Sequence, residues 1–253
     1  MDRLLVERGL VESRERAQAA ILAGQVFIGG QVASKPGSLV DPEAPIALRE
    51  REPYVSRGGL KLKAALAAFS IKVEGRICLD VGASTGGFTD CLLQEGAKKV
   101  YAVEVGYGQL HHRLRKDPRV VLLERTNIRH LKPDALPERS DFATVDVSFI
   151  SLSLVLPPLA ALLTEPVEIV ALVKPQFEVG KGQVGKGGVV RDPEQHRAVL
   201  LRVGKGAQEV GLHVFGIVPS PLLGPKGNRE FFVHLCRKGT PQGLEELVQA
   251  ALT

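Results

Sequence analysis

The sequence of 253 residues contains no tryptophan, one methionine and only three cysteines. The cysteines are Cys78, Cys91 and Cys236, and their odd number and wide spacing exclude a disulfide framework and a CxxC metal site. We expect three reduced thiols in the core of a cytoplasmic protein, because free cysteine is among the most often buried residues. The scarcity of tryptophan and methionine also argues against a surface rich in stacking side chains.

Long hydrophobic runs are absent as well, since no stretch approaches the ~20 apolar residues that a membrane-spanning helix needs. The first ten residues, MDRLLVERGL, are charged throughout and lack the apolar core of a signal peptide. We therefore expect neither secretion nor a membrane partner. What remains is an ordinary globular composition, 44% apolar and 24% charged, with a net charge of +5 that permits a nucleic-acid partner without requiring one.

The first fifty residues have the pattern of a small α+β unit. A short helix is expected around Arg3–Arg8, and Ser13 is placed to cap a second helix that runs to Ala23. Residues 25–33 then predict two short strands around a pair of glycines. We place a domain at 1–50.

A linker is predicted at 51–59, where Pro53 and two glycines lie among charged residues, and a larger domain is predicted at 60–253. In the larger domain, β-branched apolar runs predict strands at 77–82, 98–105, 120–125, 142–148, 168–175, 213–220 and 229–236. Helical segments separate most of them, notably 151–163 and 193–210. This alternation predicts an α/β fold with a mostly parallel, Rossmann-like sheet and helices on both faces.

The string LDVGASTGGFT, residues 79–89, lies between a predicted strand and a predicted helix. Its glycines let backbone amides approach a ligand at the helix N-terminus, where such sheets bind cofactors. Ser84 stands where the dinucleotide fingerprint requires glycine, which argues against a dehydrogenase. Glu104 ends the next strand, and an acid there is placed to bind both ribose hydroxyls of an adenosine-type cofactor. A plain strand–helix turn is the alternative.

Two further polar residues end predicted strands, at the edge where ligand crevices of such sheets open. Asp146 follows three apolar residues, and its alternative role is an N-cap for the next helix. Lys174 ends the fifth strand before Pro175, where a buried lysine requires a partner, and its alternative is a side chain that extends into solvent.

Three charged residues give weaker signals. Lys61 and Lys63 lie on a predicted helix but on different faces, so one is expected to point inward and the other into solvent. Glu230 begins the last predicted strand, and a solvated edge charge is its alternative. On the residues alone, surface positions are favoured for the lysines.

Several other chemistries are disfavoured. The loop Gly180–Gly187 nearly matches a phosphate-binding loop, but its last position lacks the hydroxyl that would bind magnesium, so we reject an ATPase. A basic loop near a polyanion fits better, with a plain surface loop as the alternative. No HxxxH or HxxE cluster indicates a metal, and no GxSxG elbow indicates a hydrolase.

Over nearly its full length the chain resembles the TlyA, or hemolysin A, family of rRNA 2′-O-methyltransferases, which have an FtsJ/RrmJ-like catalytic domain. The resemblance rests on seven strings: YVSRGGLKL (54–62), LDVGASTGGFT (79–89), VGYGQL (105–110), DPRVVLLERTN (117–127), DVSFISL (146–152), LVKPQFEVGKGQVGKGGVV (172–190) and SPLLGPKGN (220–228). Residues 1–50 resemble the RNA-binding domain named after the small-subunit ribosomal protein S-four.

This resemblance implies a class I methyltransferase sheet, S-adenosylmethionine as cofactor, and a catalytic tetrad of two lysines and two acids. The tetrad falls on Lys61, Asp146, Lys174 and Glu230. The implied cofactor residues are Asp80, Gly82, Ala83, Ser84, Thr85, Gly86, Gly87, Phe88, Glu104, Asn127 and Asp146. Candidate RNA contacts are Arg14, Arg16, Lys35, Arg57, Lys181 and Lys186.

The implied partner is ribosomal RNA or a ribosomal subunit, with a cytidine of large-subunit rRNA as target and small-subunit rRNA as an open second substrate. The N-terminus starts later than in longer relatives, which favours the large subunit alone. Glu12 departs from relatives that carry a basic residue, which weakens the expected RNA contact there. The competing hypotheses are a non-catalytic ribosome-assembly factor and a membrane-lytic hemolysin. The oligomeric state stays open.

Overall fold

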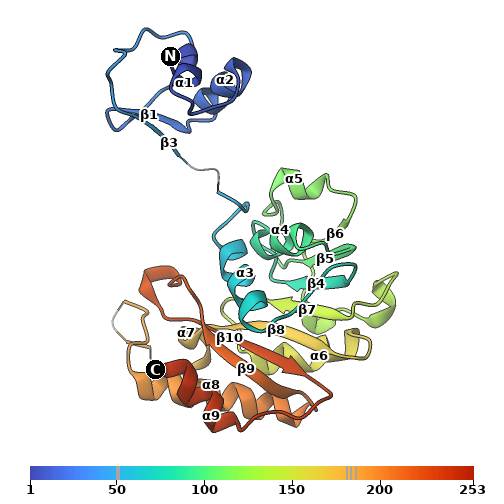
Figure 1. Cartoon of the computed structure of the whole chain (residues 1–253). Coiled ribbons are helices and arrows are strands. Elements are labelled where there is room, and N and C mark those ends of the chain that lie inside the picture. The colour runs from blue at the N-terminus through green and yellow to red at the C-terminus, as the bar shows by residue number, and fades with distance from the viewer. Residues whose placement is uncertain (50–51, 181, 183, 186) are drawn as a thin grey trace. The chain divides into compact units, whose positions relative to one another are not determined.

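The computed structural model describes residues 1–49, 52–180, 182, 184–185 and 187–253 (Figure 1). The chain forms two compact units, Met1–Pro53 and Tyr54–Thr253. The second unit therefore includes most of the stretch in which we expected a linker. Tyr54 is buried, and its ring lies so close to Gly59 that a Cβ at Gly59 would be 2.1 Å from it. The backbone N–H of Val55 donates to the Asp90 carboxylate at 2.8 Å.

The first unit pairs two short helices with a three-stranded antiparallel sheet of order β2-β1-β3. Its elements are α1 (Asp2–Glu7), α2 (Arg14–Leu22), β1 (Val26–Ile28), β2 (Gln31–Val32) and β3 (Ile46–Leu48). The Ser13 hydroxyl accepts from the Arg16 N–H at 3.3 Å, which confirms the predicted cap. Strand β3 had no clear signal in the sequence.

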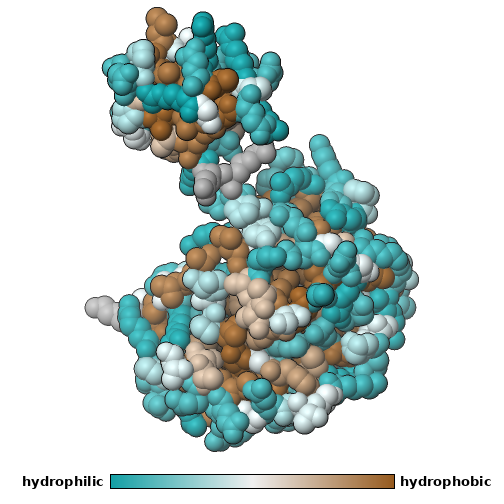
Figure 2. All heavy atoms as spheres, in the orientation of Figure 1, coloured by the Kyte–Doolittle hydropathy of each residue, from teal (hydrophilic) through white to brown (hydrophobic). Residues whose placement is uncertain are grey.

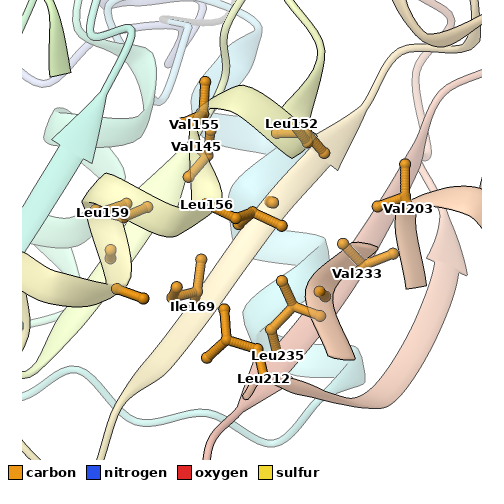
Figure 3. Close-up of a cluster of buried hydrophobic side chains, with 14 of the residues drawn as sticks. Val145, Leu152, Val155, Leu156, Leu159, Ile169, Val203, Leu212, Val233 and Leu235 are labelled. Atoms are coloured by element: carbon orange, nitrogen blue, oxygen red, sulfur yellow. The ribbon is translucent and has the colours of Figure 1, made fainter. Parts of the chain in front are cut away.

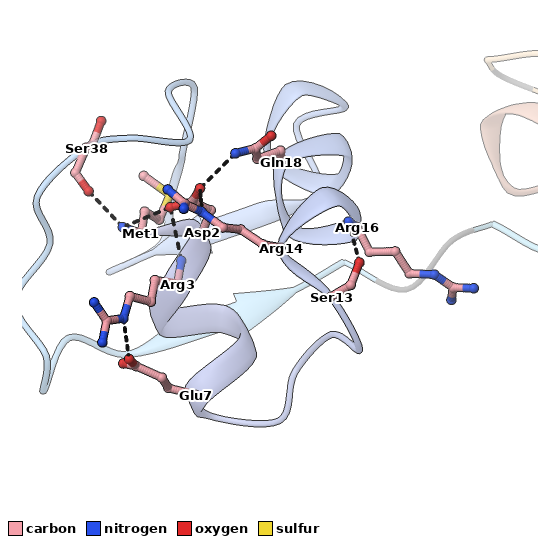
Figure 4. A network of polar contacts seen from close by, with 9 residues as sticks. All are labelled: Met1, Asp2, Arg3, Glu7, Ser13, Arg14, Arg16, Gln18 and Ser38. Atoms are coloured by element: carbon pink, nitrogen blue, oxygen red, sulfur yellow. Dashed lines mark hydrogen bonds and ion pairs between the residues drawn. The ribbon is translucent and has the colours of Figure 1, made fainter.

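A polar network ties α1 to α2 at the edge of the small core of the first unit (Figure 4). The Asp2 carboxylate accepts from Arg14 Nε at 2.8 Å and from Gln18 Nε2 at 2.9 Å. These hydrogen bonds favour the ionised acid, and they lower the pKa of Asp2 to about 2. The network compensates for the few apolar side chains that so small a unit buries.

The second unit is built on a seven-stranded sheet of order β6-β5-β4-β7-β8-β10-β9. The strands are β4 (Ile77–Val81), β5 (Lys99–Val103), β6 (Val120–Leu123), β7 (Phe142–Val145), β8 (Glu168–Val173), β9 (His213–Pro219) and β10 (Phe231–Cys236). The five strands from β4 to β8 pair in parallel, whereas β10 runs antiparallel to both of its neighbours. The expectation of a mostly parallel sheet is confirmed.

Helices cover both faces of this sheet (Figure 1). The helices are α3 (Gly58–Ala68), α4 (Gly87–Gln94), α5 (His112–Arg115), α6 (Leu156–Leu162), α7 (Pro175–Glu178), α8 (Pro193–Glu209) and α9 (Leu244–Leu252). Short 3₁₀ turns lie at Ile128–His130, Pro133–Ala135, Leu152–Leu154 and Pro225–Gly227. The single helix expected over 151–163 is wrong in detail, because a 3₁₀ turn precedes α6 and Pro157 and Pro158 occupy its first turn.

Alternation along the strands divides the apolar side chains between two cores. In β8, Ile169 and Ala171 face α6, α8 and α9, whereas Val170 and Leu172 face α3 and α4. Figure 3 shows the first of these cores, where side chains from α6, α8, β8 and β10 interdigitate. Burial on both faces explains why these strands are nearly continuous apolar runs in the sequence.

The outer surface carries both hydrophilic and hydrophobic side chains. Figure 2 shows hydrophilic side chains over much of the visible surface of each unit. Among the described residues, no helix is both long enough and apolar enough to cross a membrane.

Candidate active site

A cavity of about 480 Å³ opens where β4, β5, β6 and β7 end, which is the position at which parallel sheets of this kind bind ligands. Of the predicted cofactor residues, those that line it are Gly82, Ser84, Glu104, Asn127 and Asp146. Apolar side chains such as Val103 and Ile128 complete the wall. The cavity therefore combines apolar surface with a few convergent polar groups, as nucleoside pockets do.

Glu104 is fixed in this cavity by the backbone. One carboxylate oxygen accepts from the Ser84 N–H at 2.8 Å and the other accepts from the Gly106 N–H at 2.7 Å. Each oxygen retains a further lone pair, so the acid can still accept hydrogen bonds from a ligand. The side chain is thus oriented before any ligand arrives.

The glycines of the 79–89 string have two different roles. Gly82 has φ +85°, and a Cβ there would lie 2.5 Å from the Asp146 carbonyl, so only glycine permits the two loops to approach. Gly86 has φ +100° and packs beside Leu110 and Leu114, and it lines neither this cavity nor the one described next. Gly86 therefore shapes the turn into α4, and its direct contact with the cofactor stays a prediction.

Asp80, another predicted cofactor residue, is set back from both cavities. Its side chain is fully buried and lines neither cavity, and its oxygens accept from the hydroxyls of Thr89 at 2.7 Å and Thr144 at 2.9 Å. Burial raises the pKa of Asp80 to about 6, although both hydroxyls favour the ionised form. This acid joins β4 to β7 and α4 beneath the cofactor loop, so it supports the loop from behind.

A second cavity, of about 290 Å³, shares Gly82, Ser84 and Asp146 with the first. It contains all four residues that the sequence proposed as a tetrad: Lys61, Asp146, Lys174 and Glu230. They come from α3, the end of β7, the end of β8 and the start of β10. The fold thus brings together charges that are up to 169 positions apart in the chain.

Lys61 and Glu230 form the first of two ion pairs in this second cavity. Lys61 Nζ donates to Glu230 Oε2 at 2.6 Å, and the two side chains are 10% and 0% exposed. The other oxygen, Glu230 Oε1, is buried and has no hydrogen-bond partner among the described residues. Lys63 points outward and pairs with Glu95 at 2.7 Å, so the expectation of one inward and one outward lysine is confirmed.

Lys174 and Asp146 form the second pair. Lys174 Nζ lies 2.6 Å from Asp146 Oδ1 and donates to Ser148 Oγ at 3.0 Å. The alternative role of Asp146 as a helix cap is excluded, since the Ser151 hydroxyl caps the following 3₁₀ turn. Lys174 is only 12% exposed, which also excludes the extended, solvated alternative.

The remaining predicted cofactor residues lie on the wall that the cofactor loop gives to the second cavity. They are Ala83, Thr85, Gly87 and Phe88. Arg57, a candidate RNA contact, lines the same cavity from the turn before α3. Lys181 and Lys186 lie outside the described residues.

The candidate RNA contacts of the first unit differ in whether an acid already pairs with them. Arg14 is engaged by Asp2 at 2.8 Å, whereas Figure 4 shows Arg16 directed away from that network. Arg16 pairs with Glu12 at 3.1 Å, so this acid neutralises a neighbouring cation. Lys35 is exposed.

Sequence reasoning missed several lining residues. Gln109 and Thr126 line the first cavity, Ser56 lines the second, and Ser148 contacts Lys174. Their only signal was membership of the strings that carry the family resemblance. Small polar residues in loops have no periodicity or charge pattern that would single them out.

Within the described residues, one group has metal-type donors, namely Glu168, His234 and Cys236. Glu168 is engaged by Arg76 and lies at the start of β8, the opposite end of the strand from Lys174. Burial raises the pKa of the Cys236 thiol to about 12, which disfavours the thiolate that binds metals. Burial also raises the pKa values of Cys78 and Cys91 to about 12.

Comparison with known proteins agrees with this geometry. The FtsJ-like methyltransferase family matches residues 54–237, and the S4 domain matches residues 2–46. The 16S/23S rRNA (cytidine-2′-O)-methyltransferase TlyA of Mycobacterium tuberculosis is 51% identical over 259 residues, which cover 100% of this chain and 97% of the relative. A candidate rRNA methyltransferase of Bacillus subtilis, YqxC, is 50% identical over 98% of this chain and 89% of its own length. A solved structure from Streptococcus thermophilus, described as a candidate hemolysin, is 46% identical with a TM-score of 0.75, covering 99% of this chain and 94% of that one.

Proposed function

Because the chain belongs to the TlyA/hemolysin A family of S-adenosylmethionine-dependent rRNA 2′-O-methyltransferases, we propose that it methylates the ribose 2′-hydroxyl of a cytidine in large-subunit rRNA. The observation that carries the assignment of chemistry is the pairing of Lys174 with Asp146 in a cavity that shares its wall with the nucleoside-type cavity. This arrangement supports a proton acceptor next to the proposed cofactor site.

The residues of the first cavity fit S-adenosylmethionine. Glu104 has lone pairs free for ribose hydroxyls, Asn127 offers a carboxamide at the end of β6, and Ile128 and Val103 provide apolar surface for a base. The close approach of Gly82 to Asp146 leaves no room for a side chain between the two cavities. When bound, the cofactor supplies a methyl group on a positively charged sulfur.

Lys174 is the proposed base. Its nitrogen takes the proton of the ribose 2′-hydroxyl, while Asp146 holds the nitrogen in place and balances the charge that the ammonium carries afterwards. Because the methyl group is already a strong electrophile, the main task of these residues is to align the hydroxyl with it.

The Lys61–Glu230 pair supports the substrate side of the cavity. Glu230 is fully buried and holds the Lys61 ammonium at the cavity wall, and Lys61 in turn neutralises the acid. Neither residue needs to change its charge during the reaction. We therefore assign this pair to binding and orientation.

The first unit supplies RNA affinity through phosphate contacts. Lys35 is exposed, whereas Arg16 forms an ion pair with Glu12 and Arg14 forms one with Asp2. Of the three cations, Lys35 is therefore the one best placed to contact a phosphate. Lys35→Ala is expected to weaken RNA binding and to reduce the salt dependence of binding by about one phosphate contact. Arg57, in the wall of the catalytic cavity, is placed to contact a phosphate next to the target nucleotide.

The decisive experiment is transfer of labelled methyl from S-adenosylmethionine to separated ribosomal subunits from a strain that lacks the gene. Wild-type protein is expected to label the large subunit, nucleoside analysis is expected to find 2′-O-methylcytidine, and Lys174→Ala is expected to be inactive. Tight RNA and cofactor binding without transfer to either subunit would favour the non-catalytic assembly factor.

Small-subunit rRNA is the second candidate substrate, because the relative from Mycobacterium tuberculosis is named for both 16S and 23S rRNA. Label in both separated subunits, lost together in Lys174→Ala, would establish dual specificity.

A further inference from the structure

Ser148 is the remaining polar contact of Lys174, and it lies in the loop that follows β7. Its hydroxyl accepts from Lys174 Nζ at 3.0 Å. Asp146, two residues earlier in the chain, lies 2.6 Å from the same nitrogen. Ser148 lines the nucleoside-type cavity, and it also lines a third cavity of about 440 Å³ that borders Lys174. The serine therefore lies between the nucleoside-type cavity and the third cavity, next to Lys174, which lines both the second and the third.

We propose that Ser148 is a positioning residue that, together with Asp146, directs the lone pair of Lys174 toward the ribose 2′-hydroxyl. The proposal rests on the function assigned to Lys174 above. The Ser148 hydroxyl engages one N–H of Lys174, whereas the Asp146 carboxylate, 2.6 Å from the same nitrogen, attracts the lysine by charge and forms no regular hydrogen bond with it. When the nitrogen is neutral, the N–H that bonds Ser148 fixes one direction, and repulsion by the Asp146 carboxylate turns the lone pair away from that acid.

The loop that carries Ser148 is held at both of its ends. The Asp146 N–H donates to the Val81 carbonyl at 2.9 Å, and the Leu152 N–H donates to the buried Glu178 carboxylate at 2.8 Å. The Ser151 hydroxyl donates to the same carboxylate at 2.7 Å. A loop anchored in this way holds the serine hydroxyl in place before substrate binds.

The backbone next to Ser148 is strained, which agrees with a functional position. Phe149 has φ +64°, a left-handed conformation that side chains larger than glycine rarely adopt, and its ring packs against Phe177 with centroids 4.8 Å apart. Strain of this kind persists only where the surroundings impose it. The two anchors and the ring contact impose it here.

Ser148→Ala tests the proposal, because the exposed side chain can be truncated without loss of core packing. With labelled S-adenosylmethionine and ribosomal subunits, kcat is expected to fall about 10- to 100-fold. The dissociation constant for S-adenosylmethionine, measured by calorimetry, is expected to stay within about twofold. Ser148→Thr keeps the hydroxyl and is expected to restore most of kcat.

The matched control is Ser153→Ala, in the 3₁₀ turn that follows the loop, where the exposed hydroxyl contacts only Ser151 among the described residues. It is expected to keep wild-type kcat. A wild-type kcat in Ser148→Ala, a loss of cofactor affinity that accounts for the whole defect, or failure of threonine to restore activity would each overturn the proposal. An active Lys174→Ala variant would contradict the function assigned to Lys174. That result can be distinguished from the three outcomes for Ser148, because it is measured in a different variant.

Discussion

The two ion pairs in the catalytic cavity differ in their access to water. The side chains of Lys61 and Glu230 are 10% and 0% exposed, whereas those of Lys174 and Asp146 are 12% and 26% exposed. A base must return its proton to solvent after each turnover, and the second pair has a route through Asp146. We call the first pair sealed because its acid, Glu230, is fully buried and offers no such route, so its charges act as a fixed scaffold. Two lysine–carboxylate pairs in one cavity thus have different roles. The Lys174–Asp146 pair takes part in the reaction, whereas the Lys61–Glu230 pair supports the structure of the site.

The largest expected effect follows from breaking the accessible pair. Lys174→Ala is expected to lower methyl transfer by about 10³-fold or more, since it removes the general base. Asp146 is left next to water, so the free energy of unfolding is expected to change by less than about 1 kcal/mol. Scintillation counting and thermal unfolding measure the two quantities.

Lys63→Ala is the matched control, because this lysine lies two positions from Lys61 and pairs with Glu95 outside the cavity. It is expected to retain full activity. A fully active Lys174→Ala would remove the distinction drawn between the two pairs.

Breaking the sealed pair is expected to affect stability first. Glu230→Gln leaves Lys61 charged and buried without its anion, which is expected to lower the free energy of unfolding by about 3 kcal/mol. For a chain of this size, a loss of that order lowers Tm by several degrees. Denaturant titration at neutral pH measures the change directly.

A second measurement separates the charge effect from general damage. Replacing both partners, Lys61→Met with Glu230→Leu, is expected to recover much of the stability that Glu230→Gln loses, although activity stays low. Glu95→Gln, at the exposed pair with Lys63, is expected to cost less than about 1 kcal/mol. Equal losses in Glu95→Gln and Glu230→Gln would contradict the assignment.

Asp80 extends the comparison to a buried acid that has hydroxyl partners but no cation. Because burial raises the pKa of Asp80 to about 6, the folded chain holds this proton more tightly than the unfolded chain does. The stabilising contribution is complete below about pH 4 and is lost as the pH rises to about 6. The total change is on the order of 3 kcal/mol.

Asp80→Asn removes this titration, and an amide can still bond both threonine hydroxyls. The stability of the variant relative to wild type is therefore expected to increase between pH 4 and pH 6, as chemical denaturation across that range would measure. A constant difference would show that Asp80 does not titrate there. Asp141→Asn, at a half-buried acid in the same unit, is a suitable control.

The smallest expected effect concerns the acid of the first unit. Hydrogen bonds from Gln18 and Arg14 lower the pKa of Asp2 to about 2, so its contribution is present above about pH 4 and is lost as the pH falls toward 2. Amide hydrogen exchange of residues 1–49 is expected to show this loss in the wild type. Asp2→Asn is expected to be less stable at neutral pH and to change less with acid.

The sequence predicted much of this fold but only part of the site. The continuous apolar strands predicted a sheet covered on both faces, and Ser13 predicted the start of its helix. By contrast, the helix expected over 151–163 is interrupted, and Asp80 lies behind the cofactor loop instead of in it. Residues that adjoin a ligand loop in the sequence can face either the cavity or the core, and strand alternation decides which.

By itself the sequence determined the two-unit organisation, the alternation of strands and helices, and, through its motifs, the family. These properties depend on local periodicity and on short strings. Only the tertiary structure decided which lysine points inward, which acid each lysine meets, and that one pair is sealed while the other reaches water. Exposure and partnership depend on contacts between strands and helices far apart in the chain, and these contacts exist only after the sheet has assembled.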